Sequence, residues 1–354
     1  MEGFHSIIKM KTIRSKAPLR LGFAGGGTDI TAYYTQFGGY VLNATISMYA
    51  HCTIVPDESG KVIFHAADLG IQEEFSSTQN LISSPALPLH TGIYNKICSD
   101  YCHSKPLSFT MTTYSDAPAG SGLGASSTMV VAIIKAFVEW LNLPLGEYDI
   151  AAMAYRIERE DLGMAGGKQD QYAATFGGFN FMEFYNDDHV IVNPLRLKRW
   201  IRNELEASMV LYYTGVSRES ANIIKEQIEH TQNGREKNLE SLHELKRQAI
   251  LMKEALLQGD FRGFSACLFN GWNAKKNAAA SISNSFLDEI HQYALNNGAE
   301  SAKISGAGGG GFMMFFCDPC RRFELIRAFK ERQGYVLIPR FTEIGTQAWT
   351  IYNN

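Results

Sequence analysis

The stretch from Asp116 to Thr128 reads DAPAGSGLGASST and places Gly120, Gly122 and Gly124 directly before an apolar pattern of helical period. A β-rich segment, Leu107–Tyr114, precedes it. Closely spaced glycines let backbone N–H groups converge, and the N-terminus of the following helix adds a positive partial charge. The stretch therefore predicts a loop that binds an oligophosphate.

The hydroxyl side chains that end this stretch, Ser126, Ser127 and Thr128, have two interpretations. One of them can cap the helix, or one can bind Mg²⁺ beside the phosphates. The loop alone does not decide between these roles. It does exclude a P-loop NTPase, because the pattern GxxxxGK[ST] occurs nowhere in the chain.

A second glycine-rich stretch, Gly306–Gly311, satisfies the pattern GxGxxG. The strand-like run Phe312–Phe316 follows it, where a dinucleotide-binding fold requires a helix. This context disfavours a nicotinamide-dependent oxidoreductase. A tight turn between two buried strands is the structural alternative for this stretch.

Acidic side chains gather near a third group of glycines, Gly163–Gly178. Asp170 follows flexible glycines, from where a carboxylate can reach a substrate hydroxyl, although a single loop Asp is more commonly a helix cap. Glu158 lies on the preceding predicted helix with Glu160 and Asp161, and such a cluster is commonly a solvated face. Its pairing with the hydroxyl loop makes Glu158 a candidate metal ligand.

The periodicity along the chain predicts an α+β fold with a boundary near residue 200. The predicted strands are Tyr49–Val55, Lys61–His65, Leu107–Tyr114, Phe179–Phe184, Met209–Tyr213, Ser301–Ser305, Phe312–Phe316 and one after residue 331. The predicted helices are a segment from Ser126 to Phe137, Ile150–Ile157, Arg218–Gln258 with a break at Asn233–Gly234, Ser285–Asn296 and Arg321–Glu331.

The composition limits the classes of binding partner that we expect. The 354 residues carry 33 Lys and Arg against 36 Asp and Glu, a formal net charge of −3, and no basic tract stands out. Neither a nucleic acid nor a membrane is therefore an expected partner, and a small molecule is. Six cysteines are too few for a disulfide framework in a chain of this length, which predicts reduced thiols in the cytoplasm. The oligomeric state is left open, with a homodimer as one candidate.

Four segments together resemble the GHMP kinases, which include galactokinases, homoserine kinases and mevalonate kinases. They are Ala17–Arg20 with Gly25–Asp29, then Pro118–Ser127, Gly166–Gly178 and Ser305–Gly311. The resemblance implies two domains, a left-handed βαβ N-terminal domain that binds ATP (residues 1–200) and a ferredoxin-like C-terminal domain (residues 201–354). ATP and its acceptor would lie in the cleft between them.

The resemblance also implies roles for individual residues. Asp170 matches the catalytic aspartate, Arg20 a basic catalytic residue, and Ser126 the Mg²⁺-binding serine. Glu158 matches the acidic partner of that serine, although one extra residue separates it from Asp170. The implied ATP-binding residues are Pro118, Gly120, Gly122, Leu123, Gly124, Ala125, Ser126 and Ser127.

Within this family, the N-terminal segment is most similar to the subgroup that phosphorylates D-glycero-D-manno-heptose 7-phosphate on its anomeric hydroxyl. The alternatives are a kinase for a free sugar such as fucose or galactose, and a non-catalytic sugar sensor. A phosphorylated acceptor needs cations in the cleft. The expected acceptor-binding residues are Gly26, Gly27, Thr28, Asp29, Lys168, Arg218, Lys275 and Gly308.

Overall fold

The structure, a computed structural model, describes residues 10–103, 105–216, 220–233 and 236–353. Its strands are β1 (Met10–Ala24), β2 (Gly39–Pro56), β3 (Lys61–Ala66), β4 (Ile71–Ser76), β5 (Phe109–Ser115), β6 (Phe179–Phe184), β7 (Val190–Pro194), β8 (Met209–Tyr213), β9 (Ala299–Ile304), β10 (Phe312–Cys317), β11 (Tyr335–Leu337) and β12 (Gln347–Asn353). Its α-helices are α1 (Thr31–Phe37), α2 (Pro88–Tyr101), α3 (Ala125–Leu141), α4 (Glu147–Arg156), α5 (Gln169–Phe176), α6 (Arg199–Ser208), α7 (Ser220–Gln232), α8 (Glu236–Gln258), α9 (Phe261–Ala278), α10 (Ser285–Asn296) and α11 (Arg322–Lys330). A π-helical turn, Ile157–Asp161, continues α4, and a 3₁₀ turn, Ala280–Ile282, follows α9.

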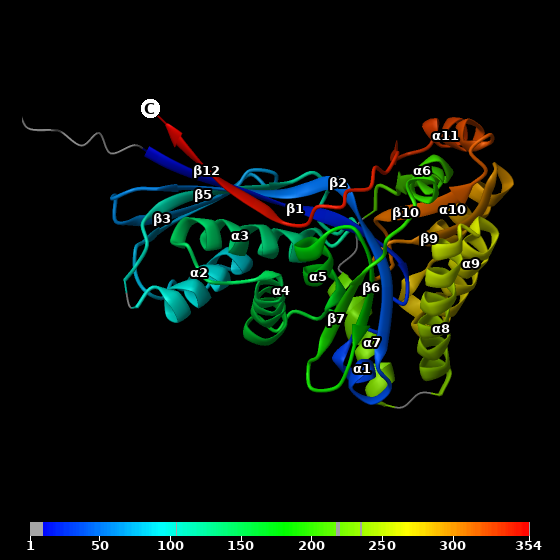
Figure 1. Cartoon of the computed structure of the whole chain (residues 1–354), viewed down its shortest axis with the longest axis horizontal. Coiled ribbons are helices and arrows are strands. Elements are labelled where there is room, and N and C mark those ends of the chain that lie inside the picture. The colour runs from blue at the N-terminus through cyan, green and yellow to red at the C-terminus, as the bar shows by residue number, and fades with distance from the viewer. Residues whose placement is uncertain (1–9, 104, 217–219, 234–235, 354) are drawn as a thin grey trace, which may run out of the picture.

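The larger sheet is built around the long strand β2, which passes from one set of partners to another. Its first residues, Gly39–Ala44, pair with β6, and Ala50–Pro56 pair with β5. The strand order is β12-β1-β2-β5-β3-β4, with β6 and β7 continuing from β2. The neighbours are antiparallel except β3 and β5, which are parallel. Helices α2 to α5 lie along one side of this sheet (Figure 1).

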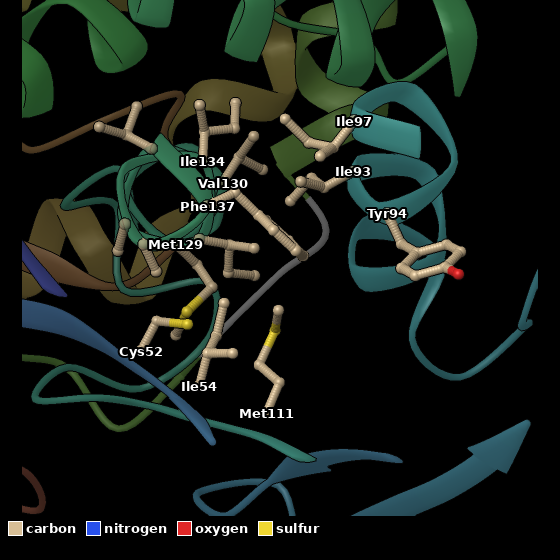
Figure 2. Packing of buried hydrophobic residues seen from close by; sticks show 14 of the residues in the cluster. Cys52, Ile54, Ile93, Tyr94, Ile97, Met111, Met129, Val130, Ile134 and Phe137 are labelled. Carbon is tan, nitrogen blue, oxygen red and sulfur yellow. The ribbon is translucent and has the colours of Figure 1, made fainter. Parts of the chain in front are cut away.

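The core around the larger sheet forms where α3 packs on that sheet. Apolar side chains cover most of α3, so nearly all of its residues from Ser127 to Phe137 are buried. Figure 2 shows side chains of α2 and α3 meeting those of β2 and β5. The labelled members are Cys52, Ile54, Ile93, Tyr94, Ile97, Met111, Met129, Val130, Ile134 and Phe137. This packing fixes the start of α3, where the glycine-rich loop ends.

The smaller sheet has the order β11-β8-β10-β9 and is antiparallel. The chain runs β8, helices, β9, β10, α11, β11, which is the βαββαβ connection of a ferredoxin-like fold. The sequence Phe312–Cys317 is apolar at every position, and each of its residues is buried. The α+β fold and the ferredoxin-like second half are therefore confirmed.

The chain ends in the sheet where it began. β12 pairs antiparallel with β1, from Met10 opposite Asn353 to Lys16 opposite Gln347. The expected boundary near residue 200 falls in α6. This helix lies between β7, a strand of the larger sheet, and β8, the first strand of the smaller sheet. The expected segment 201–354 thus spans the whole smaller sheet and one strand of the larger one.

Candidate active site

A cavity of about 750 Å³ lies where the glycine-rich segments meet. Its lining comes from β1, the segment directly after β1, and the loop before α3. The π-helical turn with the loop after it, the start of α5, helices α7 and α9, and the loop between β9 and β10 complete the lining. The lining residues used below are Arg20, Gly26, Gly27, Asp29, Gly120, Gly122, Gly124, Ala125, Ser126, Ser127, Glu158, Arg159, Ala165, Gly166, Gly167, Gln169, Asp170, Lys225, Lys275 and Gly306.

An ion pair between Arg20 and Asp170 lines this cavity. Arg20 Nε donates to Asp170 Oδ1 over 2.7 Å, and Arg20 Nη1 donates to the carbonyl of Gly122 over 2.6 Å. The pairing of β1 with β2 is irregular on both sides of Arg20, and such irregularities re-aim side chains. Arg20 is buried, whereas 21% of the Asp170 side chain is exposed. Asp170 is therefore fixed by Arg20 and open to a ligand in the cavity.

The loop before α3 presents its backbone to the cavity. Gly120, Gly122 and Gly124 have φ angles of +70°, +78° and +78°, which favour glycine. Gly124 is the N-cap of α3, and glycine has no side chain that could accept a hydrogen bond from the first turn. The first N–H groups of α3 are thus open to an anion. A Cβ at Gly124 would lie 3.2 Å from Asp170 Oδ2, so the loop closely approaches the candidate catalytic carboxylate.

Ser126 and Glu158 face one another, as a shared ligand requires. Ser126 Oγ donates to Glu158 Oε1 over 3.3 Å, so Ser126 is not the helix cap. Glu158 is fully buried in the π-helical turn, and Gln171 Nε2 donates to its Oε2 over 2.6 Å. The solvated-face interpretation is therefore wrong for Glu158, although it holds for the exposed Glu160. π-helical turns occur frequently at functional sites.

Asp29 links the first glycine segment to α5. Its Oδ1 accepts from the N–H of Gly27 over 3.0 Å, and its Oδ2 accepts from the N–H of Gln169 over 3.1 Å. Burial raises the pKa of Asp29, and these two N–H donors oppose the rise. A Cβ at Gly167 would lie 2.0 Å from Asp29 Oδ2, which explains the glycine there. Asp29 thus holds the start of the helix that carries Asp170.

The loop between β9 and β10 docks on the loop before α3. Ser305 Oγ donates to the carbonyl of Gly122 over 2.9 Å, and the N–H of Phe312 donates to the carbonyl of Ser121 over 2.8 Å. A Cβ at Gly122 would lie 2.4 Å from the Ser305 carbonyl oxygen. Because β10 follows this GxGxxG sequence, the dinucleotide-binding interpretation is wrong. The loop is a turn between buried strands that also joins the two halves of the site.

Two buried lysines lie at this junction. Lys275 Nζ donates to the carbonyl of Gly306, and burial, reinforced by nearby Arg20, lowers the pKa of Lys275 to about 8. Lys303 Nζ donates to the carbonyls of Gly22 and Phe23, each over 2.9 Å, and burial lowers its pKa well below the usual value. Lys303 therefore ties β9 to the strand that carries Arg20.

Lys303 and the cavity-lining cations Arg159 and Lys225 were not among the predicted site residues. The only available signal was the position of Arg159 next to Glu158. Lys225 lies in a polar helical segment and Lys303 in a short strand segment, and neither segment contains a motif.

Several expected site residues do not line the cavity. Lys168 Nζ donates to Asp188 Oδ1 over 2.6 Å and lies over the rings of Tyr34 and Tyr155, and this contact lowers the pKa of Asp188. The ammonium of Lys168 is therefore already paired with a carboxylate of the protein, and we do not count Lys168 among the acceptor-binding residues. Arg218 lies outside the described residues.

Four further expected residues, Thr28, Gly308, Pro118 and Leu123, also lie outside the cavity lining. Thr28 Oγ1 donates to the carbonyls of Gly25 and Tyr40, which closes the turn before α1. Gly308 packs against Ile282, whose carbonyl oxygen would lie 2.8 Å from a Cβ there. The carbonyl of Leu123 accepts from the N–H of Arg20 over 3.1 Å.

Two family matches cover much of the site, although Arg20, Asp29 and Lys225 lie outside both. Residues 89–178 match the N-terminal domain of the GHMP kinases, and residues 252–335 match their C-terminal domain. The first match contains the loop before α3, Glu158 and Asp170, and the second contains Lys275 and the loop between β9 and β10.

Similar proteins extend the likeness to nearly the whole chain. The D-glycero-alpha-D-manno-heptose 7-phosphate kinase of Campylobacter jejuni is 55% identical over 97% of this chain and 100% of its own length. The crystal structure of a D-glycero-D-manno-heptose 1-phosphate kinase from Bacteriodes thetaiotaomicron is 46% identical, with a TM-score of 0.83 over 96% of this chain and 100% of its own. A putative sugar kinase from C. jejuni is 52% identical, with a TM-score of 0.80 over 97% and 99% of the two chains. The chain therefore belongs to the GHMP kinase family.

Proposed function

We propose that this chain is an ATP-dependent sugar kinase that transfers the γ-phosphate of ATP to the anomeric hydroxyl of D-glycero-D-manno-heptose 7-phosphate, giving the 1,7-bisphosphate. One observation supports the reaction type most directly. The Arg20–Asp170 ion pair lines the same cavity as the glycine loop before α3 and the segment of Gly26 and Asp29, so a phosphoryl donor and an acceptor can meet beside it. The C. jejuni relative, at 55% identity, supports the choice of acceptor.

The transfer needs little covalent chemistry from the protein. The anomeric oxygen forms a bond to the γ-phosphorus as the bond from that phosphorus to the ADP oxygen breaks, and the hydroxyl proton leaves for Asp170. Arg20 offsets the charge that develops on the phosphoryl oxygens and holds Asp170 in place. The open N–H groups at the start of α3 hold the phosphates that remain on ADP.

A magnesium ion fits the oxygen donors at the start of α3. A hydroxyl and a carboxylate, from Ser126 and Glu158, face the cavity where the phosphate oxygens would lie. Mg²⁺ takes oxygen ligands and usually completes its shell with water and substrate phosphates. When bound, the ion would neutralise phosphate charge. Gln171 orients Glu158 for this role through its hydrogen bond.

The phosphate on the acceptor calls for a cation in the cavity besides Arg20. Lys275 from α9 and Lys225 from α7 line the cavity and are the candidates among the described residues. We expect Lys275→Met and Lys225→Met to show which of them binds this phosphate. The responsible variant raises KM for the sugar phosphate strongly and leaves KM for ATP nearly unchanged.

The test is to identify the product by NMR after incubation with ATP and the pure acceptor. The names of the two heptose kinases place the acceptor phosphate on different carbons, so both the 7-phosphate and the 1-phosphate are supplied, together with fucose and galactose. We expect a new phosphate on C1 of the 7-phosphate. Turnover of fucose or galactose in preference would support the free-sugar alternative, and nucleotide binding without any turnover would support the sensor.

A further inference from the structure

Arg159 is a cavity-lining cation for which the reaction above has no role. It lies in the π-helical turn next to Glu158, and 14% of its side chain is exposed. Its Nη2 donates to Ser127 Oγ over 3.2 Å, and its Nη1 donates to the carbonyl of Ala165 over 3.4 Å. A Cβ at Gly166 would lie 2.2 Å from its Cζ, so the guanidinium rests on the main chain of Gly166. Arg159 is thus held beside the first turn of α3.

The charge of Arg159 is poorly compensated among the described residues. Its Nε is buried and has no hydrogen-bond partner there. The nearest carboxylate oxygen, Glu158 Oε1, is 3.9 Å from Nη1, and the hydrogen bond from Gln171 to Glu158 is much shorter, at 2.6 Å. The positive end of the α3 dipole also disfavours a cation at this place. All three features are unfavourable unless an anion joins Arg159.

We propose that Arg159 binds the triphosphate of ATP beside the N-terminus of α3, an inference that rests on the proposed kinase function. A phosphate there completes the hydrogen bonding of the guanidinium and removes its repulsion from the helix dipole. Arginine suits this role because its planar fork matches two phosphate oxygens. A metal held by Glu158 draws on that carboxylate, which frees Arg159 further for the phosphates.

The alternative is that Arg159 only supports the loop of Ala165 and Gly166. The two roles differ in what they do to nucleotide affinity without any acceptor present. Calorimetry therefore measures the Kd of the non-hydrolysable analogue AMP-PNP, with Mg²⁺, and of adenosine. The variants are Arg159→Gln, Arg159→Lys and the matched control Arg156→Gln, which removes an exposed arginine of the preceding helix that pairs with Glu160.

We expect Arg159→Gln to weaken AMP-PNP binding about 10- to 100-fold, the scale of a lost charge-assisted contact, while adenosine binding and the control stay within about twofold of wild type. Arg159→Lys keeps the charge without the fork, so a loss of about 3- to 10-fold is expected. AMP-PNP binding within about twofold of wild type by Arg159→Lys, or by a folded Arg159→Gln, would overturn the proposal. In that case normal turnover by the wild type would leave the kinase function standing, whereas a wild type that binds no AMP-PNP would overturn both.

Discussion

Asp170 is the residue on which the chemistry depends most. We expect Asp170→Asn to lower kcat about a hundredfold or more, because the amide cannot accept the acceptor proton. The Kd for ATP should stay close to wild type, since the amide oxygen can still accept the hydrogen bond from Arg20 and the substitution removes no donor to the phosphates. Steady-state kinetics with calorimetry measures both quantities. A kcat within about threefold of wild type would make Asp170 a structural residue.

Ser126 and Glu158 are the residues proposed to hold Mg²⁺. Each of Ser126→Ala and Glu158→Gln removes or weakens one oxygen donor, so each should raise the Mg²⁺ concentration that gives half the maximal rate. Titrating Mg²⁺ at saturating ATP measures this. Because Glu158 is buried, thermal unfolding must first show that the variant is folded. An unchanged Mg²⁺ requirement in a folded Glu158→Gln variant would contradict the metal role.

Lys275 makes the reaction depend on pH if it binds the acceptor phosphate. Burial lowers its pKa to about 8, so its ammonium form, and with it the attraction for the phosphate, is lost as the pH rises through that value. We expect kcat/KM for the sugar phosphate to fall by up to about tenfold per pH unit above pH 8, measured between pH 7 and 9.5. Lys275→Arg should remove this fall, because arginine stays charged. A flat wild-type profile would exclude Lys275 from phosphate binding.

The sequence predicted Ser126, Glu158 and Asp170 as site residues from the glycine-rich segments near them, whereas Arg20 was predicted only from the resemblance to the GHMP kinases. Arg20, Asp170, Ser126 and Glu158 all line the cavity. Lys168 does not line the cavity, because its ammonium pairs with Asp188 in the hairpin of β6 and β7. A contact between distant segments leaves no local pattern, so neighbouring sequence could not reveal it.

At the scale of elements, the contact between the loop before α3 and the loop before β10 joins the two halves of the site. We expect Gly122→Ala to destabilise the protein by about 1–3 kcal/mol more than Gly60→Ala, because only the first Cβ overlaps another backbone atom. Gly60 is a matched control, since its φ is +70° against +78° and a Cβ there meets nothing within 4 Å. Urea unfolding measures the difference. An equal loss of unfolding free energy in both variants would mean that the two loops can move apart at little cost.

The sequence predicted α3, α4, α7, α8, α10 and α11 but not α2, α6 and α9, although the sequence of α6 is strongly amphipathic. The apolar face from Ser126 onward became α3, and the break near Asn233 separates α7 from α8. β1 and the first half of β2 were also missed, and β1 contains Pro18 and Gly22, residue types that usually interrupt a strand. The order of the strands depends on pairings between distant segments, which no local period encodes.

At the scale of the whole molecule, β12 returns to the larger sheet and covers the edge of β1, the strand that carries Arg20. Lys303 and the glycine loops link the smaller sheet to the same strand. The site therefore depends on both halves being docked. None of the helices in the described part of the chain combines the length and the apolar character that crossing a membrane requires.

The central claim is that the acceptor is a sugar that already carries a distant phosphate. The most direct measurement is the ratio of kcat/KM for D-glycero-D-manno-heptose 7-phosphate to that for the same heptose without its phosphate, at pH 7 and saturating ATP. Charge-assisted contacts to the phosphate predict a ratio of about 100 or more. A ratio near one would contradict the claim, since the cavity would then hold no site for that phosphate.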